Sequence, residues 1–258
     1  MRLSDRVALV TGGGRGIGAA VARSLACEGV RVAVASRTLT EIDEVARELT
    51  QAGSQAVAVQ CDVGRPEEIS SAVAQVTEEF GRIDILVNNA GIASSSSLGS
   101  QSLEEWERIF RVNVTGTFLC TQACLPGMLE RGWGRVVNVA SVAALGGAKY
   151  ISAYSASKHA VLGFTRCVAL EAASRGVTVN AVCPGYVDTD LTRASVARIM
   201  QKTGMTEGQA MQVLCKTNPQ NRLLTSEEVA HAVLVLCLPE SAGINGQALV
   251  LDGGGFVG

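Results

Sequence analysis

The chain has 258 residues, enough for one large α/β domain with a substantial core, and this length does not require a second domain. Hydrophobic residues make up 47% of the sequence and charged residues 18%, a balance that favours a packed globular protein over a disordered one. The net charge of -2 comes without a basic block, so we expect neither nucleic acid nor an anionic membrane as a partner.

The hydropathy pattern contains neither a signal peptide nor a membrane span, so we expect a cytoplasmic protein. Eight cysteines are scattered among apolar neighbours without a C-x-x-C pair, and the sequence holds two histidines. This pattern favours free, buried thiols over disulfides, and it predicts no metal site.

The first segment, residues 6–18, has the order of a dinucleotide-binding turn. A short β-branched run ends in a glycine-rich sequence, and a run of helical composition follows. Glycines let the backbone approach a pyrophosphate, to which the helix N-terminus presents its amides and the positive end of its dipole. The glycines alone could form a simple tight turn, but the flanking strand and helix favour nucleotide binding. The residues expected to bind the cofactor here are Thr11, Gly12, Arg15, Gly16, Ile17 and Gly18.

The second strand, residues 31–37, indicates which cofactor binds. A cofactor without a 2′-phosphate is normally held at the end of this strand by an Asp or Glu that bonds the ribose hydroxyls. Ser36 stands there instead, with Arg37 beside it and Arg15 in the glycine turn, so two guanidinium groups could meet a 2′-phosphate. We therefore expect NADP(H) in preference to NAD(H), with two solvated surface arginines as the alternative interpretation.

The next helix and strand carry two smaller signals. Thr38 and Glu41 have the spacing of a capping box at the start of the helix. A strand at 55–62 follows, and Asp62 and Val63 at its carboxyl end fall where an adenine ring would lie.

A fourth strand, within residues 83–91, ends in the sequence Asn88-Asn89-Ala90-Gly91. Paired asparagines can form a turn, but in the fourth strand of a doubly wound sheet they also lie at the cofactor crevice. Ser102 and Glu105 then predict the start of a long helix that carries Asn113 in its interior. Because an asparagine side chain competes for backbone groups, Asn113 suggests a kink or a polar role.

The fifth strand, 135–141, places Ser141 at its carboxyl end, the edge where ligands bind in open α/β sheets. Tyr154 and Lys158 follow with the four-residue spacing that stacks two side chains on one face of a helix. The ammonium group can then favour ionisation of the phenol, whose ordinary pKa of about 10 makes it a poor base. Taken alone, this spacing is more typical of a surface pair. His159 directly follows Lys158, so its side chain points about 100° away from that of Lys158 around the helix, and we interpret it as a packing or surface residue.

A sixth strand, 177–182, leads into Pro184-Gly185, and a last strand spans 247–252. Between them, residues 190–218 form two short amphipathic pieces, the second rich in methionine and capped by Thr206 and Gln209. A mobile lid over an apolar substrate and a pair of ordinary peripheral helices both fit this pattern. Strands and helices alternate throughout, which predicts a single-domain, Rossmann-like doubly wound parallel sheet of about seven strands with helices on both faces over residues 1–258.

The order of these motifs resembles the classical short-chain dehydrogenase/reductase family along almost the whole chain. The matching motifs are T-G-x-x-x-G-x-G at 11–18, N-N-A-G at 88–91, Ser141, Y-x-x-x-K at 154–158 and P-G at 184–185. The resemblance implies that Tyr154 donates or accepts a proton, that Ser141 bonds the carbonyl or alkoxide oxygen, and that Lys158 lowers the pKa of the phenol and holds the nicotinamide ribose. It also implies that Asn113 anchors a water relay to Lys158.

The same resemblance assigns further cofactor contacts and an assembly. It implies that the loop after the fourth strand lines the adenosine and that the loop after the sixth strand reaches the nicotinamide carboxamide. These cofactor residues are Asn89, Ala90, Gly91, Pro184, Gly185, Val187 and Thr189, beside Tyr154 and Lys158. It implies a homotetramer, or a homodimer, formed through the long helices and the C-terminal segment, and the basic pair Arg15 and Arg37 matches its NADP-preferring members.

Within the family, the run from Tyr154 to Thr165 resembles 3-oxoacyl-thioester reductases and the ketoreductases of aromatic polyketide synthesis. We therefore expect hydride transfer between NADP(H) and a ketone or secondary alcohol, with a substrate that could be carried as a thioester. The alternatives are an NAD-dependent secondary-alcohol or hydroxyacyl dehydrogenase and a non-enzymatic nucleotide-sensing or scaffold protein on the same fold. Residues 190–218 do not identify the substrate.

Overall fold

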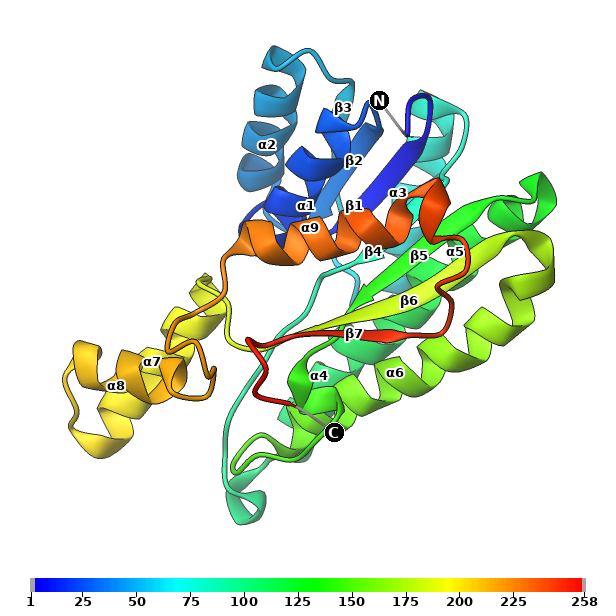
Figure 1. Ribbon diagram of the computed structural model, residues 1–258. Coiled ribbons are helices and arrows are strands. Elements are labelled where there is room, and N and C mark those ends of the chain that lie inside the picture. The colour runs from blue at the N-terminus through cyan, green and yellow to red at the C-terminus, as the bar shows by residue number, and fades with distance from the viewer. Residues whose placement is uncertain (1–2, 257–258) are drawn as a thin grey trace.

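The computed structural model describes residues 3–256, and its centre is a seven-stranded sheet in the order β3-β2-β1-β4-β5-β6-β7 (Figure 1). Every pair of neighbouring strands is parallel. The strands are β1 Val7–Thr11, β2 Arg31–Ser36, β3 Ala56–Gln60, β4 Ile85–Asn88, β5 Gly134–Val139, β6 Val177–Pro184 and β7 Ala248–Leu251. The strand order reverses between β1 and β4, so a crevice for ligands opens there at the carboxyl ends of the strands. The doubly wound parallel sheet predicted from the sequence is confirmed.

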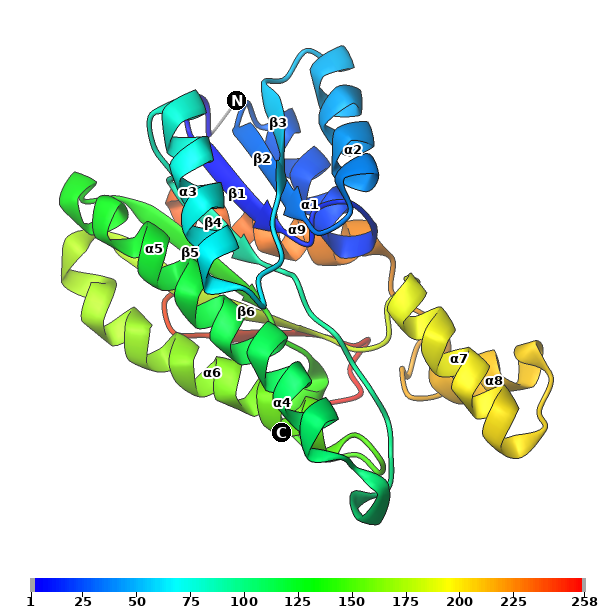
Figure 2. The same cartoon turned by 180° about the vertical axis from the view of Figure 1, so that it is seen from behind.

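Helices cover both faces of the sheet, as Figures 1 and 2 show from opposite sides. Helices α1, α2 and α9 pack on one face, and α3, α5 and α6 on the other. The helices are α1 Gly16–Cys27, α2 Leu39–Gln51, α3 Pro66–Phe80, α4 Leu103–Phe110, α5 Gly116–Arg131, α6 Ser152–Ala172, α7 Asp190–Thr203, α8 Glu207–Cys215 and α9 Ser226–Cys237. Because both faces are covered, β1 is buried throughout: Ala8 and Val10 face one layer, and Val7 and Leu9 face the other.

The long helix expected around Asn113 is interrupted. A π-helical turn, Arg111–Thr115, separates α4 from α5, and Asn113 is buried at its centre. Single π turns are frequent at functional sites because they rotate side chains out of the regular helical register. The structure thus has a local interruption of the helix and a buried polar side chain at Asn113.

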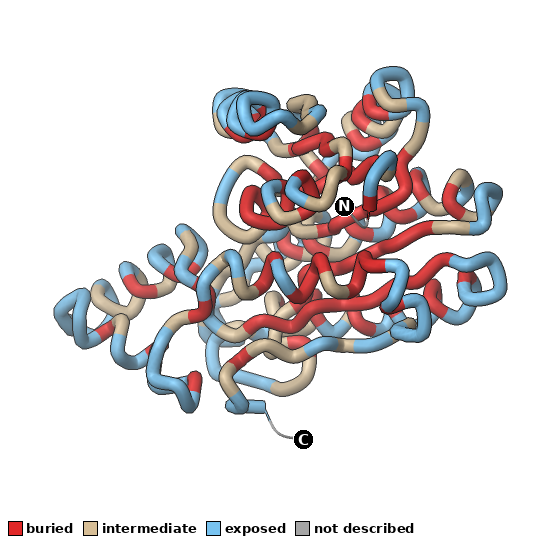
Figure 3. The backbone as a smooth tube through the Cα atoms, turned by 45° about the horizontal axis from the view of Figure 1, so that its top comes forward, coloured by how far each residue is buried: buried red, intermediate tan, exposed pale blue. Residues whose placement is uncertain are grey.

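Helices α7 and α8 stand away from the three layers, and Figure 3 shows most of their backbone in the exposed colour. They bury a small apolar cluster of their own, formed by Val196, Ala210 and Leu214 with the partly buried Ile199, Met200, Met211 and Leu223. The capping box of Thr206 and Gln209 is confirmed at the start of α8. The segment is therefore a small helical hairpin attached at the carboxyl edge of the sheet.

The predicted capping box at the start of α2 is wrong. Thr38 makes no side-chain cap hydrogen bond there, and the carboxylate of Glu41 turns to the guanidinium of Arg15, with Oε1 3.4 Å from Nη1. A charged partner attracts a carboxylate more strongly than a neutral amide does, which explains why Glu41 leaves the backbone.

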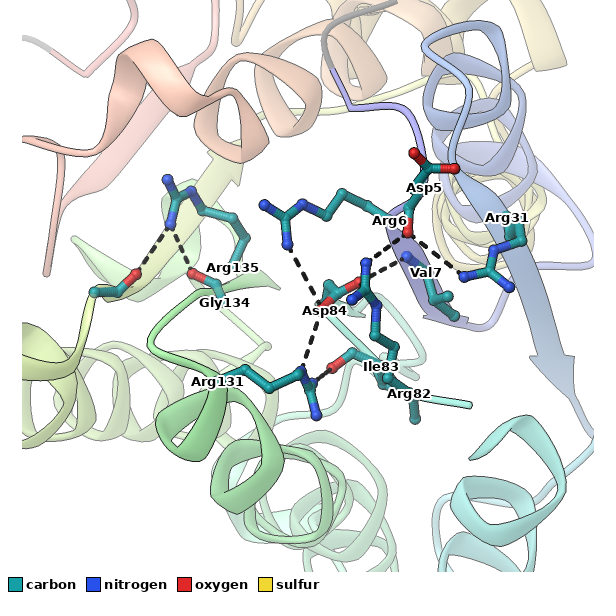
Figure 4. A network of polar contacts seen from close by, with 11 residues as sticks. Asp5, Arg6, Val7, Arg31, Arg82, Ile83, Asp84, Arg131, Gly134 and Arg135 are labelled. Atoms are coloured by element: carbon teal, nitrogen blue, oxygen red, sulfur yellow. Dashed lines mark hydrogen bonds and ion pairs between the residues drawn. The ribbon is translucent and has the colours of Figure 1, made fainter. Parts of the chain in front are cut away.

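The amino edge of the sheet, opposite the crevice, is held by a buried carboxylate (Figure 4). Asp84, which is 1% exposed, accepts a hydrogen bond of 3.1 Å from the backbone N–H of Val7. Three arginines reach the same carboxylate, with N–O distances of 2.9 Å for Arg82, 3.5 Å for Arg131 and 3.9 Å for Arg6. This cluster joins the starts of β1 and β4 to the end of α5.

All eight cysteines are free, but three of them depart from the expected burial: Cys215 on α8 is half-buried, and Cys27 and Cys167 are exposed, on α1 and α6. Cys27 and Cys167 lie on helix faces turned from the sheet, which their apolar neighbours in sequence did not reveal. Within residues 3–256 none of the helices combines the length and the apolar character of a membrane-spanning segment. The same residues contain no group of three or more side chains arranged to hold a metal ion.

Candidate active site

Ser141 lies just beyond the carboxyl end of β5, where the chain begins a short 3₁₀ turn, Val142–Ala144. Its Oγ accepts a hydrogen bond of 3.2 Å from the backbone N–H of Ala143, which uses a lone pair and leaves the hydroxyl hydrogen to be donated. Ser155 on α6 fixes this loop, because its hydroxyl donates to the carbonyl of Ala143 at 2.8 Å. Ser141 is thus a positioned donor at the ligand edge of the sheet.

Tyr154 and Lys158 lie one turn apart on α6, as the spacing predicted, with Lys158 Nζ 5.8 Å from the centre of the phenol ring. Lys158 is 5% exposed, and its Nζ donates to the carbonyl of Val139 at 2.8 Å. Burial lowers the pKa of Lys158 to about 8. The ammonium group therefore connects α6 to the end of β5 in a site from which water is largely excluded.

Burial also raises the pKa of the Tyr154 phenol above its ordinary value, and a hydrogen bond with Ser141 opposes this effect. Lys158 Nζ is directed at the carbonyl of Val139 in the protein alone, and the lowering of the phenol pKa by Lys158 that the resemblance implied stays a prediction. Because its pKa is raised, the phenol is protonated near neutral pH. A protonated phenol beside a serine hydroxyl can supply a proton and a hydrogen bond to one oxygen atom.

Asn113 is locked by three hydrogen bonds of its side chain. Its Nδ2 donates to the carbonyl of Ile92 at 2.9 Å and to Ser157 Oγ at 3.0 Å, and its Oδ1 accepts from the N–H of Ile92 at 2.9 Å. The loop after β4 is thereby attached to the middle of α6. Gly91 stands between them, since a Cβ atom there would lie 3.4 Å from Asn113 Oδ1 and 3.6 Å from Lys158 Nζ. The structure thus brings Asn113, Gly91 and Lys158 together.

The glycine turn joins β1 to α1 in a close-packed form. Gly12 and Gly16 have φ angles of +63° and +50°, which favour glycine, and a Cβ atom on Gly18 would collide with the carbonyl oxygen of Gly12. Among residues 3–256 no side chain caps the start of α1 at Arg15, so the first amides of the helix remain available. A tight turn followed by uncapped helix amides fits a pyrophosphate.

Asn89 packs against the glycine turn. Its Nδ2 donates to the carbonyls of Thr11 and Gly12, each at 3.0 Å, so its side chain holds the glycine turn from behind. Thr11 Oγ1 accepts from the backbone N–H groups of Asn89 and Ala90 at 3.1 and 3.2 Å. These contacts make Asn89 a support for the turn, with its amide occupied by protein carbonyls.

The residues expected at the adenosine end surround the carboxyl ends of β2 and β3. Ser36 Oγ donates to the carbonyl of Thr38 at 3.3 Å, and Arg37 beside it is exposed. Asp62 Oδ1 accepts from the N–H of Gly64 at 2.9 Å, which closes a local turn. Val63 is 7% exposed and packs in the core layer, so its side chain is turned from the crevice.

The residues expected at the nicotinamide end follow β6, whose last residue is Pro184. The N–H of Gly185 donates to the carbonyl of Leu251 on β7 at 2.8 Å, and Val187 is buried against Leu224. Thr189 returns to the glycine turn, since a Cβ atom on Gly16 would lie 3.2 Å from Thr189 Cγ2. The nicotinamide end of the expected cofactor site thus meets the glycine turn at Gly16 and Thr189.

A buried polar chain beneath the site was not predicted. Asn88 Nδ2 donates to Thr121 Oγ1 at 3.0 Å and to Asn138 Oδ1 at 2.9 Å, and Asn138 Nδ2 donates to Thr165 Oγ1 at 2.8 Å. The chain connects α5, β4, β5 and α6. Asn138 interrupts the apolar run of β5, a signal that could have identified it, whereas the two threonines have no such signal. Tyr186 was also missed; it lies close enough to Tyr154 to raise the pKa of that phenol.

Comparisons with known proteins agree with this geometry. The family model described as short chain dehydrogenase matches residues 6–199. A 3-oxoacyl-[acyl-carrier-protein] reductase of Synechocystis sp. is 41% identical over 254 residues, which cover 98% of this chain and 97% of the relative. A D-beta-hydroxybutyrate dehydrogenase of Rhizobium meliloti is 38% identical, covering 96% of this chain and 98% of the relative. A solved variant of actinorhodin polyketide ketoreductase with NADPH superposes with a TM-score of 0.94 at 39% identity, covering 98% of each chain. The chain belongs to the short-chain dehydrogenase family.

Proposed function

We propose that the chain is an NADP(H)-dependent oxidoreductase that reduces a ketone to a secondary alcohol, with a 3-oxoacyl thioester or a polyketide-type ketone as its substrate. The observation that carries this proposal is the convergence of Ser141, Tyr154 and Lys158 at the edge of the sheet next to the glycine turn. The relatives named as a 3-oxoacyl reductase and a polyketide ketoreductase support the substrate class.

NADPH, when bound, supplies the hydride. Ser141 would hold the substrate oxygen by redirecting to it the hydroxyl hydrogen that bonds Tyr154 in the protein alone, and Tyr154 would give its phenolic proton to the same oxygen as negative charge develops there. Lys158 would hold the nicotinamide ribose and pass a proton to the phenolate that remains, and Asn113 would anchor the water relay that returns a proton to Lys158. The uncapped amides of α1 and the glycines of the turn hold the pyrophosphate.

Tyr154 fits either direction of the reaction. Its phenol carries a proton near neutral pH and can act as the acid in reduction, and the phenolate that remains can act as the base in oxidation. The alternative is an NAD-dependent hydroxyacyl or secondary-alcohol dehydrogenase, which requires a phenolate as base. The relative named D-beta-hydroxybutyrate dehydrogenase supports this alternative. Ser36 and Arg37 at the end of β2 favour the phosphorylated cofactor.

The test is a turnover screen of short and long 3-oxoacyl thioesters, cyclic ketones and diketones with NADPH and with NADH, for the wild type and for Arg37→Ala. We expect reduction of a ketone with NADPH as the better cofactor, and a smaller preference in Arg37→Ala because a charge that meets the 2′-phosphate is gone. Efficient turnover with NADH that is insensitive to Arg37 would support the dehydrogenase instead.

We further propose that residues 1–258 form one domain in which 190–218 acts as the substrate lid. The methionines of the hairpin support an apolar substrate there, because Met200 and Met211 are only partly buried and Met205 is 38% exposed. A homotetramer, or a homodimer, is supported by apolar side chains left exposed on α5, α6 and the edge strand β7: Phe118, Leu170 and Leu249. Eight free thiols support a reducing, cytoplasmic location.

A further inference from the structure

The guanidinium of Arg15 is already paired in the protein alone. Its Nη1 lies 3.4 Å from Glu41 Oε1 and 3.2 Å from Asp190 Oδ2. Glu41 is in the first turn of α2, and Asp190 is the first residue of α7. Arg15 therefore connects the glycine turn to the helix after β2 and to the α7–α8 hairpin.

Arg37, the second arginine of the expected 2′-phosphate site, differs from Arg15 in its ion pairing. Within the described part of the chain no carboxylate pairs with the guanidinium of Arg37, whose backbone carbonyl accepts from Gln60 Nε2 at 3.0 Å. The glycine turn runs beside Arg37, because the N–H of Gly13 donates to the carbonyl of Ala35 at 3.1 Å, two residues before it. A 2′-phosphate at the end of β2 would thus meet Arg37, which has no carboxylate partner among the described residues, and Arg15, which is paired with two carboxylates.

Asp190 has a second partner that makes its release easy. Its Oδ1 lies 3.2 Å from Arg193 Nη1, one turn along α7, while Asp188 pairs with the same arginine at 3.1 Å and does not contact Arg15. Thr189 keeps α7 against the turn, so the carboxylate of Asp190 stays within reach of Arg15. Asp190 can move from Arg15 to Arg193 without displacing the hairpin.

We propose that Asp190 is a specificity-determining residue that competes with the 2′-phosphate for Arg15 and so reduces the preference for NADP(H) over NAD(H). The proposal rests on the proposed function, because it requires a 2′-phosphate at the end of β2. A phosphate dianion must take the Arg15 guanidinium from Asp190 and Glu41, whereas a ribose hydroxyl does not compete for it. The hairpin expected to set substrate choice thereby also affects cofactor choice.

The test measures the binding of two nucleotides that lack the nicotinamide, 2′,5′-ADP and 5′-ADP, by calorimetry at low ionic strength. The ratio of their dissociation constants isolates the 2′-phosphate. Asp190→Asn keeps the size of the side chain and remains acceptable at a helix start, so the hairpin should fold. The matched control is Asp188→Asn, which removes the same charge from Arg193 but not from Arg15.

We expect Asp190→Asn to increase the preference for 2′,5′-ADP about three- to fivefold, the upper part of the range of one exposed ion pair, and Asp188→Asn to change it less than about 1.5-fold. In an Arg15→Met background Asp190→Asn should have no effect. Equal shifts in both aspartate variants, weaker binding of 2′,5′-ADP in Asp190→Asn, or an effect that persists without Arg15 would overturn the proposal.

The same data separate this inference from the proposed function. A wild type that prefers 2′,5′-ADP, loses that preference in Arg37→Ala and does not respond to Asp190→Asn overturns the role of Asp190 alone. A wild type that binds 5′-ADP equally well, with no change in Arg37→Ala, overturns the NADP(H) assignment and the role of Asp190 with it. Circular dichroism and thermal unfolding of each variant confirm that α7 and the core are intact.

Discussion

Replacing Lys158 with Met should stabilise the protein while removing its turnover. Lysine has an ordinary pKa of 10.5, and that of Lys158 is about 8. The charged side chain therefore destabilises the folded state by about 3 kcal/mol near neutral pH. Met fills a similar volume without a charge. Loss of the hydrogen bond to the carbonyl of Val139 offsets about 1 kcal/mol of this gain. We therefore expect the free energy of unfolding to rise by about 2 kcal/mol at pH 7.

The stability difference between the wild type and Lys158→Met should depend on pH. Below pH 8 the folded and the unfolded chain both bind the proton of Lys158, and the whole penalty is present. Between about 8 and 10.5 the unfolded chain alone binds it, so the stability contributed by this site rises with pH in the wild type. The advantage of Lys158→Met should accordingly shrink across this interval.

The assay is urea unfolding of the wild type and Lys158→Met at pH 7 and pH 9.5, at one protein concentration because assembly contributes to apparent stability. A variant that is less stable than the wild type at pH 7, or an advantage that does not change with pH, would refute the reasoning from burial.

Two further substitutions test the frame of the site. Gly18→Ala should weaken NADPH binding by more than tenfold, because its Cβ atom would collide with the Gly12 carbonyl in the turn; fluorescence titration measures this, and binding equal to that of the wild type would show that the turn adapts. Asp84→Asn should lower the free energy of unfolding by about 3 kcal/mol, because it leaves three arginines around a neutral amide. Its kcat/KM should stay within about twofold of the wild-type value, because the cluster lies at the edge of the sheet opposite the active site. A stable variant in urea unfolding, or a large loss of kcat/KM at a temperature where the variant is folded, would contradict this prediction.

The sequence predicted the layers of this fold because its strands are apolar runs separated by amphipathic helices, a pattern that leaves few arrangements. It also placed Ser141, Tyr154 and Lys158 at one edge, since strand ends and helical spacing follow from local order. Asn113 was recognised as unusual because an asparagine inside a helix conflicts with local propensity.

Side-chain direction and burial could not be predicted in the same way. Glu41 has the position of a capping residue, but its choice of Arg15 depends on how close α2 lies to the glycine turn. Asn89 turns to the back of that turn, and Lys158 turns to Val139; each choice is decided by carbonyl groups distant in sequence. The raised pKa of the Tyr154 phenol follows from burial, which exists only in the folded protein.

The most direct test of the central claim is to measure NADPH binding and single-turnover reduction in Tyr154→Phe. Because phenylalanine keeps the ring and lacks the transferable proton, we predict a dissociation constant for NADPH within about twofold of the wild-type value and a turnover rate reduced by about 10² to 10⁴. Reduction of the ketone at the wild-type rate by Tyr154→Phe would contradict the assignment of Tyr154 as the proton donor.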